Sequence, residues 1–396
     1  MIIGLLHDII LVSLSPFIIP YTLVRYKDKI KKGTAPRFAL THIVSDIIVH
    51  SSSIGETKNA LLFSEHIRKI FPQKKIINTV FTQTAMKTFP ETVSMTIPLF
   101  TVQSLLINTK NLIFFESDIW PSYILSAKRN KSKILLVSGK ISQKTAEYWK
   151  KIPILTEAKK LIDHVFAKDE ENLARFKYAG FPSVSLSIDL KNLIFLRDRK
   201  KMKIKTNKKI LLGLSTRGAD EIKFLLQSYV PNKIGLIIAP RHDFEEAEKI
   251  VSEYAEYIKL TEIMQKSQNK KIETIKEQIE NSINNNKIIL VDTYGITEEI
   301  LKISDLCFLG GTISNIGGHN VLEPISFGVP VFAGPNNWNI PKEIINEGIV
   351  KEVKSPDELK NYVVKSENME EKIYGFIKQK SSKVKGELEK IASYIV

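Results

Sequence analysis

An acid and several small residues follow an apolar run early in the sequence. Residues 49–56 read Val-His-Ser-Ser-Ser-Ile-Gly-Glu, which is typical of a strand that turns into a helix, and Gly55 permits close backbone approach there. The free amides and dipole of a helix start stabilise a carboxylate as an anion, so Glu56 could accept a proton as a general base. The spacing Ser53-x-x-Glu56 is also that of a capping box, in which both side chains only satisfy helix amides. Both interpretations remain open.

A second acid, Glu116, ends another apolar run and is followed by Ser-Asp-Ile-Trp-Pro at residues 117–121. If Glu116 lies near Glu56, it could alter how readily Glu56 takes up a proton, or it could orient an acceptor hydroxyl. The alternative is that Ser117 or Asp118 caps a helix that has Pro121 in its first turn. The sequence does not separate these two roles.

Pro240-Arg241-His242 directly follows a strand candidate in the second half of the chain. An arginine at a strand end can bind phosphate or carboxylate oxygens with its fork of donors, and His242 could add another donor. Exposed arginines are common at strand ends, so this motif gains weight only beside a second anion-binding feature.

That second feature is the glycine-rich segment 308–324, Phe-Leu-Gly-Gly-Thr-Ile-Ser-Asn-Ile-Gly-Gly-His-Asn-Val-Leu-Glu-Pro. A strand, a loop and a helix in this order can direct backbone amides, hydroxyls and a helix amino end at a phosphate. Glu323 could accept hydrogen bonds from a ribose diol, or it could complete a capping box with Asn320. The expected binding residues are Gly310, Gly311, Thr312, Gly317, Gly318, His319, Asn320 and Glu323.

The glycine-rich segment lacks the G-x-G-x-x-G and G-x-x-x-x-G-K-[ST] spacings of dinucleotide and P-loop sites. The sequence also contains no Asp-x-Asp pair, which argues against a metal held on a sugar diphosphate. We therefore expect a donor with a single phosphate and no metal or cofactor.

The elements that position these residues alternate between short apolar runs and amphipathic ones, the pattern of an α/β protein with parallel sheets. We predict two doubly wound domains, with ligands at the carboxyl ends of the strands, an active site in the cleft between the domains, and a helix at 58–70. The predicted strands are 47–50, 75–80, 112–115, 133–137, 164–167 and 184–188 in the first half, and 210–214, 234–239, 287–291, 306–309 and 329–333 in the second.

The expected domain organisation has four parts. An apolar anchor helix at 1–30 precedes a first domain at 31–197, a basic linker at 198–209 and a second domain at 210–396, whose last helix could pack back on the first domain. The anchor is predicted because basic residues follow the apolar start, as they do on the cytoplasmic side of membrane segments. A buried amino-terminal helix is the alternative, because the apolar stretch is short for a full crossing.

Composition narrows the class of protein. The chain has 396 residues, 43% of them hydrophobic, and a net charge of +15, so it can bury sizeable cores and is not a disordered chain. The charge suits an anionic partner such as an acidic lipid surface, a phosphorylated substrate or nucleic acid. Nucleic acid is not expected, because no recognised binding module occurs. The one cysteine, Cys307, cannot form an internal disulfide.

Together these motifs resemble the Kdo transferase family, membrane-associated GT-B glycosyltransferases that move 3-deoxy-D-manno-octulosonic acid (Kdo) from CMP-Kdo onto lipid A precursors. The resemblance implies a GT-B fold, with Glu56 as catalytic base and Glu116 beside it. It also implies that the CMP side is bound by Arg241 and by Gly318, His319, Asn320 and Glu323, with Glu323 on the ribose. The likeness lies in residues 53–56, 116–121, 240–242, 292–295 and the glycine-rich segment through 318–324.

The chain is similar to a divergent member of that family. Kdo transferases usually have Ser-Thr-His-Glu-Gly-Glu-Glu where residues 215–221 read Ser-Thr-Arg-Gly-Ala-Asp-Glu. The resemblance implies inverting transfer of Kdo, or a similar acidic sugar, from a CMP-activated donor to a lipid A-type acceptor at the cytoplasmic face of the inner membrane. The alternatives are a GT-B transferase or epimerase that uses a UDP-activated sugar, and a membrane-tethered nucleotide-binding protein that has lost its acceptor site.

Overall fold

The computed structural model describes residues 43–80, 82–94, 107–117, 119–265, 272–365 and 369–395, together with the single positions 9, 13, 14 and 16. The predicted anchor at 1–30 therefore lies outside the described residues, apart from those single positions. No helix within the described ranges is long and apolar enough to cross a membrane.

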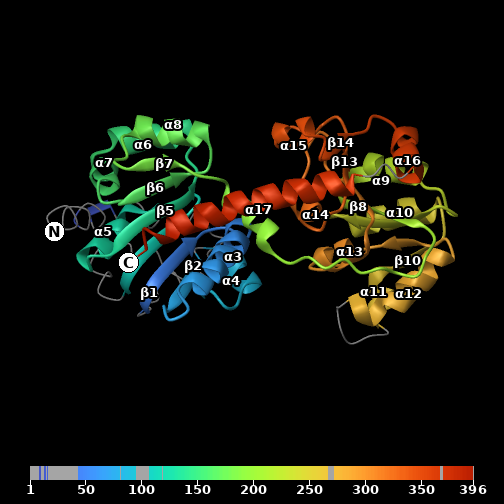
Figure 1. Cartoon of the computed structure of the whole chain (residues 1–396), viewed down its shortest axis with the longest axis horizontal. Coiled ribbons are helices and arrows are strands. Elements are labelled where there is room, and N and C mark those ends of the chain that lie inside the picture. The colour runs from blue at the N-terminus through green and yellow to red at the C-terminus, as the bar shows by residue number, and fades with distance from the viewer. Residues whose placement is uncertain are drawn as a thin grey trace. The chain divides into compact units, whose positions relative to one another are not determined.

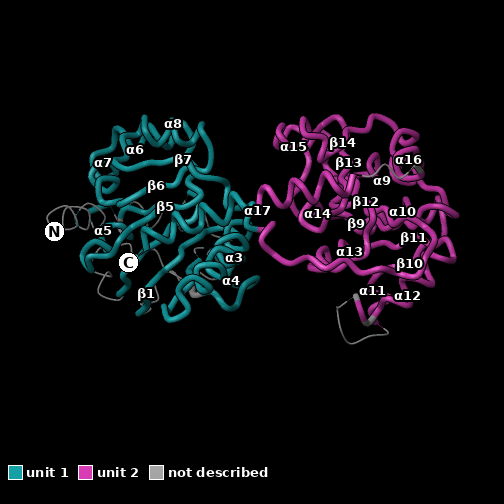
Figure 2. Tube along the Cα trace, viewed as in Figure 1, with its two compact units in different colours: residues 1–193, 382–396 teal, residues 194–381 magenta. Residues whose placement is uncertain are grey.

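The chain divides into two compact units (Figure 2). Unit 1 comprises Met1–Leu193 and Ser382–Val396, and unit 2 comprises Ile194–Ser381. Each unit contains one seven-stranded sheet, and every strand pair in both sheets is parallel (Figure 1). The predicted fold class, two doubly wound α/β domains, is confirmed.

The sheet of unit 1 has the strand order β3-β2-β1-β4-β5-β6-β7. The chain fills one side of β1 before it returns to the other side at β4, so the strand order reverses between these two strands. The strands are β1 (Ile43–Ser51), β2 (Ile76–Val80), β3 (Val93–Ser94), β4 (Ile107–Phe115), β5 (Lys133–Gly139), β6 (His164–Ala167) and β7 (Val184–Leu186). The helices are α3 (Ile54–Ile70), α4 (Gln83–Thr88), α5 (Pro121–Arg129), α6 (Gln143–Lys151), α7 (Pro153–Lys159), α8 (Glu170–Ala179) and the 3-10 helix η3 (Leu190–Leu196).

The sheet of unit 2 has the order β10-β11-β9-β8-β12-β13-β14, which reverses between β8 and β12. Its strands are β8 (Lys209–Thr216), β9 (Ile234–Pro240), β10 (Tyr257–Lys259), β11 (Ile288–Leu290), β12 (Leu306–Leu309), β13 (Val331–Ala333) and β14 (Val350–Glu352). Its helices are α9 (Gly218–Gln227), α10 (Phe244–Ser252), α11 (Leu260–Gln265), α12 (Ile272–Asn284), α13 (Thr297–Ile303), α14 (Leu322–Ser326), α15 (Lys342–Asn346), α16 (Pro356–Lys365) and α17 (Glu370–Ala392).

Burial explains why the central strands are apolar along their whole length. Strands of a parallel sheet covered by helices on both faces read as continuous hydrophobic runs. Ile47, Ile48 and Val49 of β1 are fully buried, and so are Leu211 and Leu212 of β8. The sheets therefore form rigid platforms whose carboxyl ends carry the polar loops.

The basic stretch 198–209, expected as a linker, packs on unit 2. Met202 and Ile204 lie against the hydrophobic core of this unit, and Arg199 donates a hydrogen bond to Glu298 at 2.7 Å. The boundary between the units falls earlier, after Leu193. The many lysines and arginines of this stretch are typical of a solvated linker. The apolar side chains of Met202 and Ile204 nevertheless attach it to unit 2.

The end of the chain belongs to unit 1, and the division falls inside α17. Ser187 donates a hydrogen bond to Glu387 at 2.8 Å. The ring of Tyr394 lies 4.6 Å from that of His164 and 5.2 Å from that of Phe166, measured between ring centroids. These contacts place the end of the chain against side chains of β6 and the residue that follows β7.

Candidate functional site

Glu56 lies in the first turn of α3, directly after β1. Its Oε2 accepts hydrogen bonds from the backbone amides of Ser52 at 3.1 Å and Ser53 at 3.0 Å, while Ser53 Oγ accepts one from the amide of Glu56. The capping box is thus formed. Among the described residues, Glu56 Oε1 has no hydrogen-bond partner, so the cap orients the carboxylate and leaves one oxygen for other chemistry.

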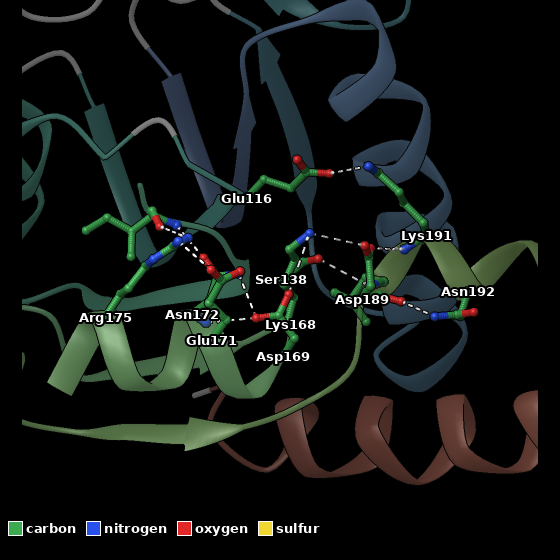
Figure 3. A network of polar contacts seen from close by, with 12 residues as sticks. Glu116, Ser138, Lys168, Asp169, Glu171, Asn172, Arg175, Asp189, Lys191 and Asn192 are labelled. Atoms are coloured by element: carbon green, nitrogen blue, oxygen red, sulfur yellow. Dashed lines mark hydrogen bonds and ion pairs between the residues drawn. The ribbon is translucent and has the colours of Figure 1, made fainter. Parts of the chain in front are cut away.

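Glu116 follows β4 and is buried, with 6% of its surface exposed. Its backbone adopts a φ of 66°, a left-handed conformation that costs a non-glycine residue about 1–3 kcal/mol and is often found at functional sites. Lys191 Nζ lies 3.9 Å from Glu116 Oε1, as Figure 3 shows. Oε1 is buried and makes no hydrogen bond within the described part of the chain.

Burial raises the pKa of Glu116, and the negative charges of Asp189 and Glu56 act in the same direction. Lys191 and Lys140 oppose the shift in pKa. β1 and β4 are neighbouring parallel strands with His50 opposite Phe114. Glu56 and Glu116 therefore both follow the carboxyl ends of adjacent strands.

The strand order of the unit 1 sheet reverses between β1 and β4. Open α/β sheets bind ligands at the carboxyl ends of the strands at such a position. The N-cap of α5 is Trp120, which provides no side-chain bond, so Ser117 is not the cap that the alternative predicted. Pro121 does occupy the first turn of that helix. Asp118 lies outside the described residues.

Replacing Glu116 by glutamine is expected to stabilise unit 1 at neutral pH. A carboxyl with a raised pKa favours its protonated form in the fold, so its contribution is complete below the unfolded pKa and is lost as pH rises through the folded pKa. The stability of Glu116→Gln relative to the native chain should therefore grow between pH 4 and pH 8, as measured by urea unfolding. A difference that is constant over this range would contradict the shift.

In unit 2, three neighbouring strands end beside one another. In register, Thr216 of β8 pairs with Pro240 of β9, and Leu309 of β12 pairs with Leu214 of β8. Arg241 directly follows the last residue of β9, and its amide donates a hydrogen bond to the carbonyl of Thr216 at 3.0 Å. Its side chain is exposed. The order of this sheet reverses between β8 and β12, so the glycine-rich segment also starts at the ligand-binding edge.

His242 lies next to Arg241 and is also exposed. Its Nδ1 is 3.4 Å from the hydroxyl of Tyr294, which belongs to the segment 292–295 noted in the sequence. The ring of Tyr294 packs on Phe244 at 5.1 Å between centroids. Two segments far apart in the chain thus meet at the end of β9.

Glu221 of α9, which the sequence analysis did not select, holds the glycine-rich segment. It is fully buried, and its carboxylate accepts five hydrogen bonds. The donors are the amides of Arg217 (2.7 Å), Gly311 (2.9 Å), Ile313 (3.0 Å) and Ser314 (3.1 Å) and the hydroxyl of Ser314 (3.0 Å). Of these donors, only the amide of Gly311 belongs to a residue that was expected to bind a ligand.

Other residues that were expected to bind a ligand instead make hydrogen bonds within the protein. The amide of Gly310 donates to Leu214, and that of Gly318 donates to Gly311. Thr312 is buried, and its hydroxyl donates to the carbonyl of Leu309 and accepts from the amide of Gly334. Gly310, Gly311, Thr312 and Gly318 therefore build the loop.

The outward part of the loop is the segment around His319 and Asn320. His319 is half-buried and Asn320 is exposed, and no partner occurs for their backbone amides within the described ranges. Gly317 has a φ of 95°, and a Cβ there would lie 2.4 Å from Trp338. This glycine lets the turn that carries Trp338 pack closely behind the outward segment.

Replacing Gly310 by alanine is expected to destabilise unit 2. The added Cβ would lie 2.2 Å from the carbonyl oxygen of Ser215, a backbone atom that cannot rotate away, so we expect a loss of about 1–3 kcal/mol in the free energy of unfolding. Gly375, in the exposed part of α17, has open space around it. Gly375→Ala should instead stabilise by about 0.5–1 kcal/mol, and urea unfolding of both variants checks the pair. Equal effects would contradict the close approach.

Glu323 lies half-buried in the first turn of α14. The capping box with Asn320 is not formed, because the N-cap is Val321 and no side-chain bond is made there. The helix is only five residues long, so its dipole adds little to an anion site.

Positive charge collects around His319. Burial lowers the pKa of His319, and so do Arg241, Arg217 and His242, while Glu221 opposes them. Arg217 Nε donates to His319 Nε2 at 3.3 Å. In the sequence, Arg217 stands out only as a departure from the family motif. Within the described ranges, no group of three or more His, Cys, Asp or Glu side chains could hold a metal ion.

Comparisons with known proteins agree with the motifs. Residues 24–194 match the family described as 3-deoxy-D-manno-octulosonic-acid transferase (kdotransferase). The chain is 28% identical over 387 residues to the 3-deoxy-D-manno-octulosonic acid transferase of Aquifex aeolicus, which covers 93% of this chain and 98% of the relative. It is also 27% identical to a bifunctional glycosyltransferase/methyltransferase of Fusobacterium nucleatum, over 88% of this chain but only 57% of that protein.

Among solved structures, a glycosyltransferase from Rickettsia africae matches 88% of this chain and 97% of its own, with a TM-score of 0.50 and 14% identity. This likeness concerns the fold alone. The predicted resemblance to Kdo transferases is confirmed, and the chain is a glycosyltransferase with the GT-B fold.

Proposed function

We propose that this glycosyltransferase moves Kdo, or a similar acidic sugar, from a CMP-activated donor to a hydroxyl of a lipid A-type acceptor. The observation that carries the proposal is that Glu56 and Glu116 follow the adjacent strands β1 and β4, where the strand order of the unit 1 sheet reverses. The similarity to Kdo transferases supports the choice of donor sugar.

The proposed chemistry is a single displacement with inversion at the anomeric carbon. Glu56 takes the proton of the acceptor hydroxyl, the oxygen attacks the anomeric carbon, and CMP leaves from the opposite face with the bonding electrons. A general base of this kind contributes about 10²–10⁴-fold to the rate. Glu116, protonated more readily than an ordinary carboxyl, can donate a hydrogen bond beside the base without adding a second full negative charge.

The donor is assigned to unit 2. Arg241 offers a fork of charged donors to the phosphate, and the amides of His319 and Asn320 add neutral ones. Stabilising the negative charge that develops on the leaving phosphate is often the largest catalytic term. Glu323 is proposed to bind the ribose, and the scheme routes no step through a metal ion.

The lipid acceptor and the membrane are also part of the proposal. A chain with a net charge of +15 is attracted to an acidic lipid surface and to phosphorylated lipids. We propose that it works at the cytoplasmic face of the inner membrane. Binding to vesicles that contain acidic lipid, and its loss at high salt, would support this location.

The test incubates detergent-solubilised protein with CMP-Kdo and a panel of lipid A precursors and weighs the products by mass spectrometry. A product heavier by one or more Kdo residues supports the proposal. A parallel thermal-shift titration compares CMP with UDP, because a bound ligand raises the melting temperature. Stabilisation by UDP but not by CMP would favour the UDP-sugar alternative. Binding of CMP with no transfer to any acceptor would favour a decayed enzyme.

A further inference from the structure

Arg217 occupies a position beside Arg241 that no motif assigned to binding. It directly follows β8, as Arg241 follows β9, and these neighbouring strands pair Thr216 with Pro240. The two arginines therefore start from adjacent points at the edge of the sheet, about 4.8 Å apart, the spacing of neighbouring strands. Unlike scattered surface charges, they are placed by the register of the sheet.

Two contacts hold Arg217 in this place. Its amide is bound by the buried carboxylate of Glu221 at 2.7 Å, and its Nε donates to His319 Nε2 at 3.3 Å. Because His319 Nε2 accepts this bond, the ring proton of the neutral imidazole lies on Nδ1. Arg217 is only half-exposed. The fold therefore already restricts its side chain, which loses less conformational entropy when it binds a ligand.

The positive charge of this cluster is not neutralised within it. Glu221 is the acid that raises the pKa of His319. Its carboxylate accepts all five of its hydrogen bonds from donors of the loop and from the backbone amide of Arg217. Neither guanidinium makes an ion pair with a carboxylate inside the described ranges. Two neighbouring arginines without counter-ions favour a ligand that carries two anionic groups close together.

We propose that Arg217 binds the carboxylate of the donor sugar while Arg241 binds its phosphate. In a CMP-activated 2-keto sugar acid, the carboxylate and the phosphate oxygen are attached to the same anomeric carbon, so two cations on adjacent strands match them. This inference rests on the proposed function and deepens it, because it names the residue that selects an acidic sugar. Arg217 is a donor-binding residue and takes no part in proton transfer.

The experiment measures two constants for each variant: the KM for CMP-Kdo and the inhibition constant of CMP, which lacks the carboxylate. Arg217→Gln removes the charge but keeps an N–H donor for His319. We expect it to raise the KM for CMP-Kdo by about 10- to 100-fold, as for loss of a charge-assisted hydrogen bond, and to change CMP inhibition by less than threefold. Lys223→Gln, at an exposed position of α9, the helix that follows Arg217, is the control for an equal change of charge.

Two further variants sharpen the result. Arg217→Lys keeps the charge and should recover at least threefold of the lost affinity, whereas Arg241→Ala should weaken CMP-Kdo and CMP alike. A rise of the CMP inhibition constant in Arg217→Gln equal to the rise in KM would overturn the inference, and so would unchanged constants or no recovery by lysine. If the native chain neither binds CMP nor transfers Kdo, the proposed function itself fails, which is a distinct outcome.

Discussion

Replacing Glu56 by glutamine is expected to lower the rate of sugar transfer by about 10²–10⁴-fold, the contribution of a general base, while CMP binding stays unchanged. Glutamine can still accept the amide bonds of Ser52 and Ser53 that the carboxylate accepts now, because a capping box functions with Glu or Gln. Only the ability to take a proton is lost. Single-turnover transfer assays and a CMP titration measure the two quantities.

The matched control is Ser53→Ala, which removes the other half of the capping box and leaves the carboxylate. It should cost about 0.5–2 kcal/mol of stability and change the transfer rate only a few-fold. If Glu56→Gln keeps near-normal turnover, Glu56 is not the base. If Ser53→Ala loses as much activity as Glu56→Gln, the cap and not the proton transfer is what the site requires.

Replacing Glu221 by alanine is expected to destabilise unit 2 by about 3–5 kcal/mol, because each buried donor that loses its acceptor costs about 1–3 kcal/mol. The reason is that the amides of Arg217, Gly311, Ile313 and Ser314 would lose their acceptor together. Because the same bonds fix the glycine-rich segment, CMP affinity should fall by about tenfold or more. Urea unfolding and calorimetric titration with CMP measure these effects.

Asp220→Asn is the control for Glu221, because Asp220 is the preceding residue of the same helix and is exposed. Removing the charge of Asp220 should change the free energy of unfolding by less than about 0.5 kcal/mol. Glu221→Gln should fall between the two, since it keeps one acceptor oxygen but presents an amide group to the N–H donors of the loop. A stable Glu221→Ala variant with unchanged CMP affinity would refute the role of Glu221 in holding the loop.

Sequence patterns predicted most of the fold because buried parallel strands are apolar throughout. Each predicted strand overlaps an observed one, and those at 164–167 and 306–309 match in both bounds. The three strands that were missed, β3, β10 and β14, have two or three residues and lie at the edges of the two sheets. The predicted strands β7, β11 and β13 are as short, but β11 and β13 are buried apolar runs, whereas β10 and β14 include partly exposed polar residues.

The site was predictable where the signal is local. The capping box of Glu56 follows from four consecutive residues, and the positions of Glu116 and Arg241 follow from the strands before them. Glu221 could not be found in this way, because its partner Gly311 lies 90 residues further along the chain. The glycine count predicted a phosphate loop, but Gly310 is required by the carbonyl of Ser215, a contact with the protein itself.

The division of the chain inside α17 affects how the protein is made. Unit 1 begins at the amino terminus but needs Ser382–Val396 to be complete, and the bond between Ser187 and Glu387 joins residues 200 positions apart. Domains usually fold in the order of their synthesis. Here unit 2 can fold before residues 382–395 of unit 1 are made, and until then the rings of His164 and Phe166 lack their contacts with Tyr394. Chaperone binding to nascent chains should therefore persist until residues 382–395 emerge.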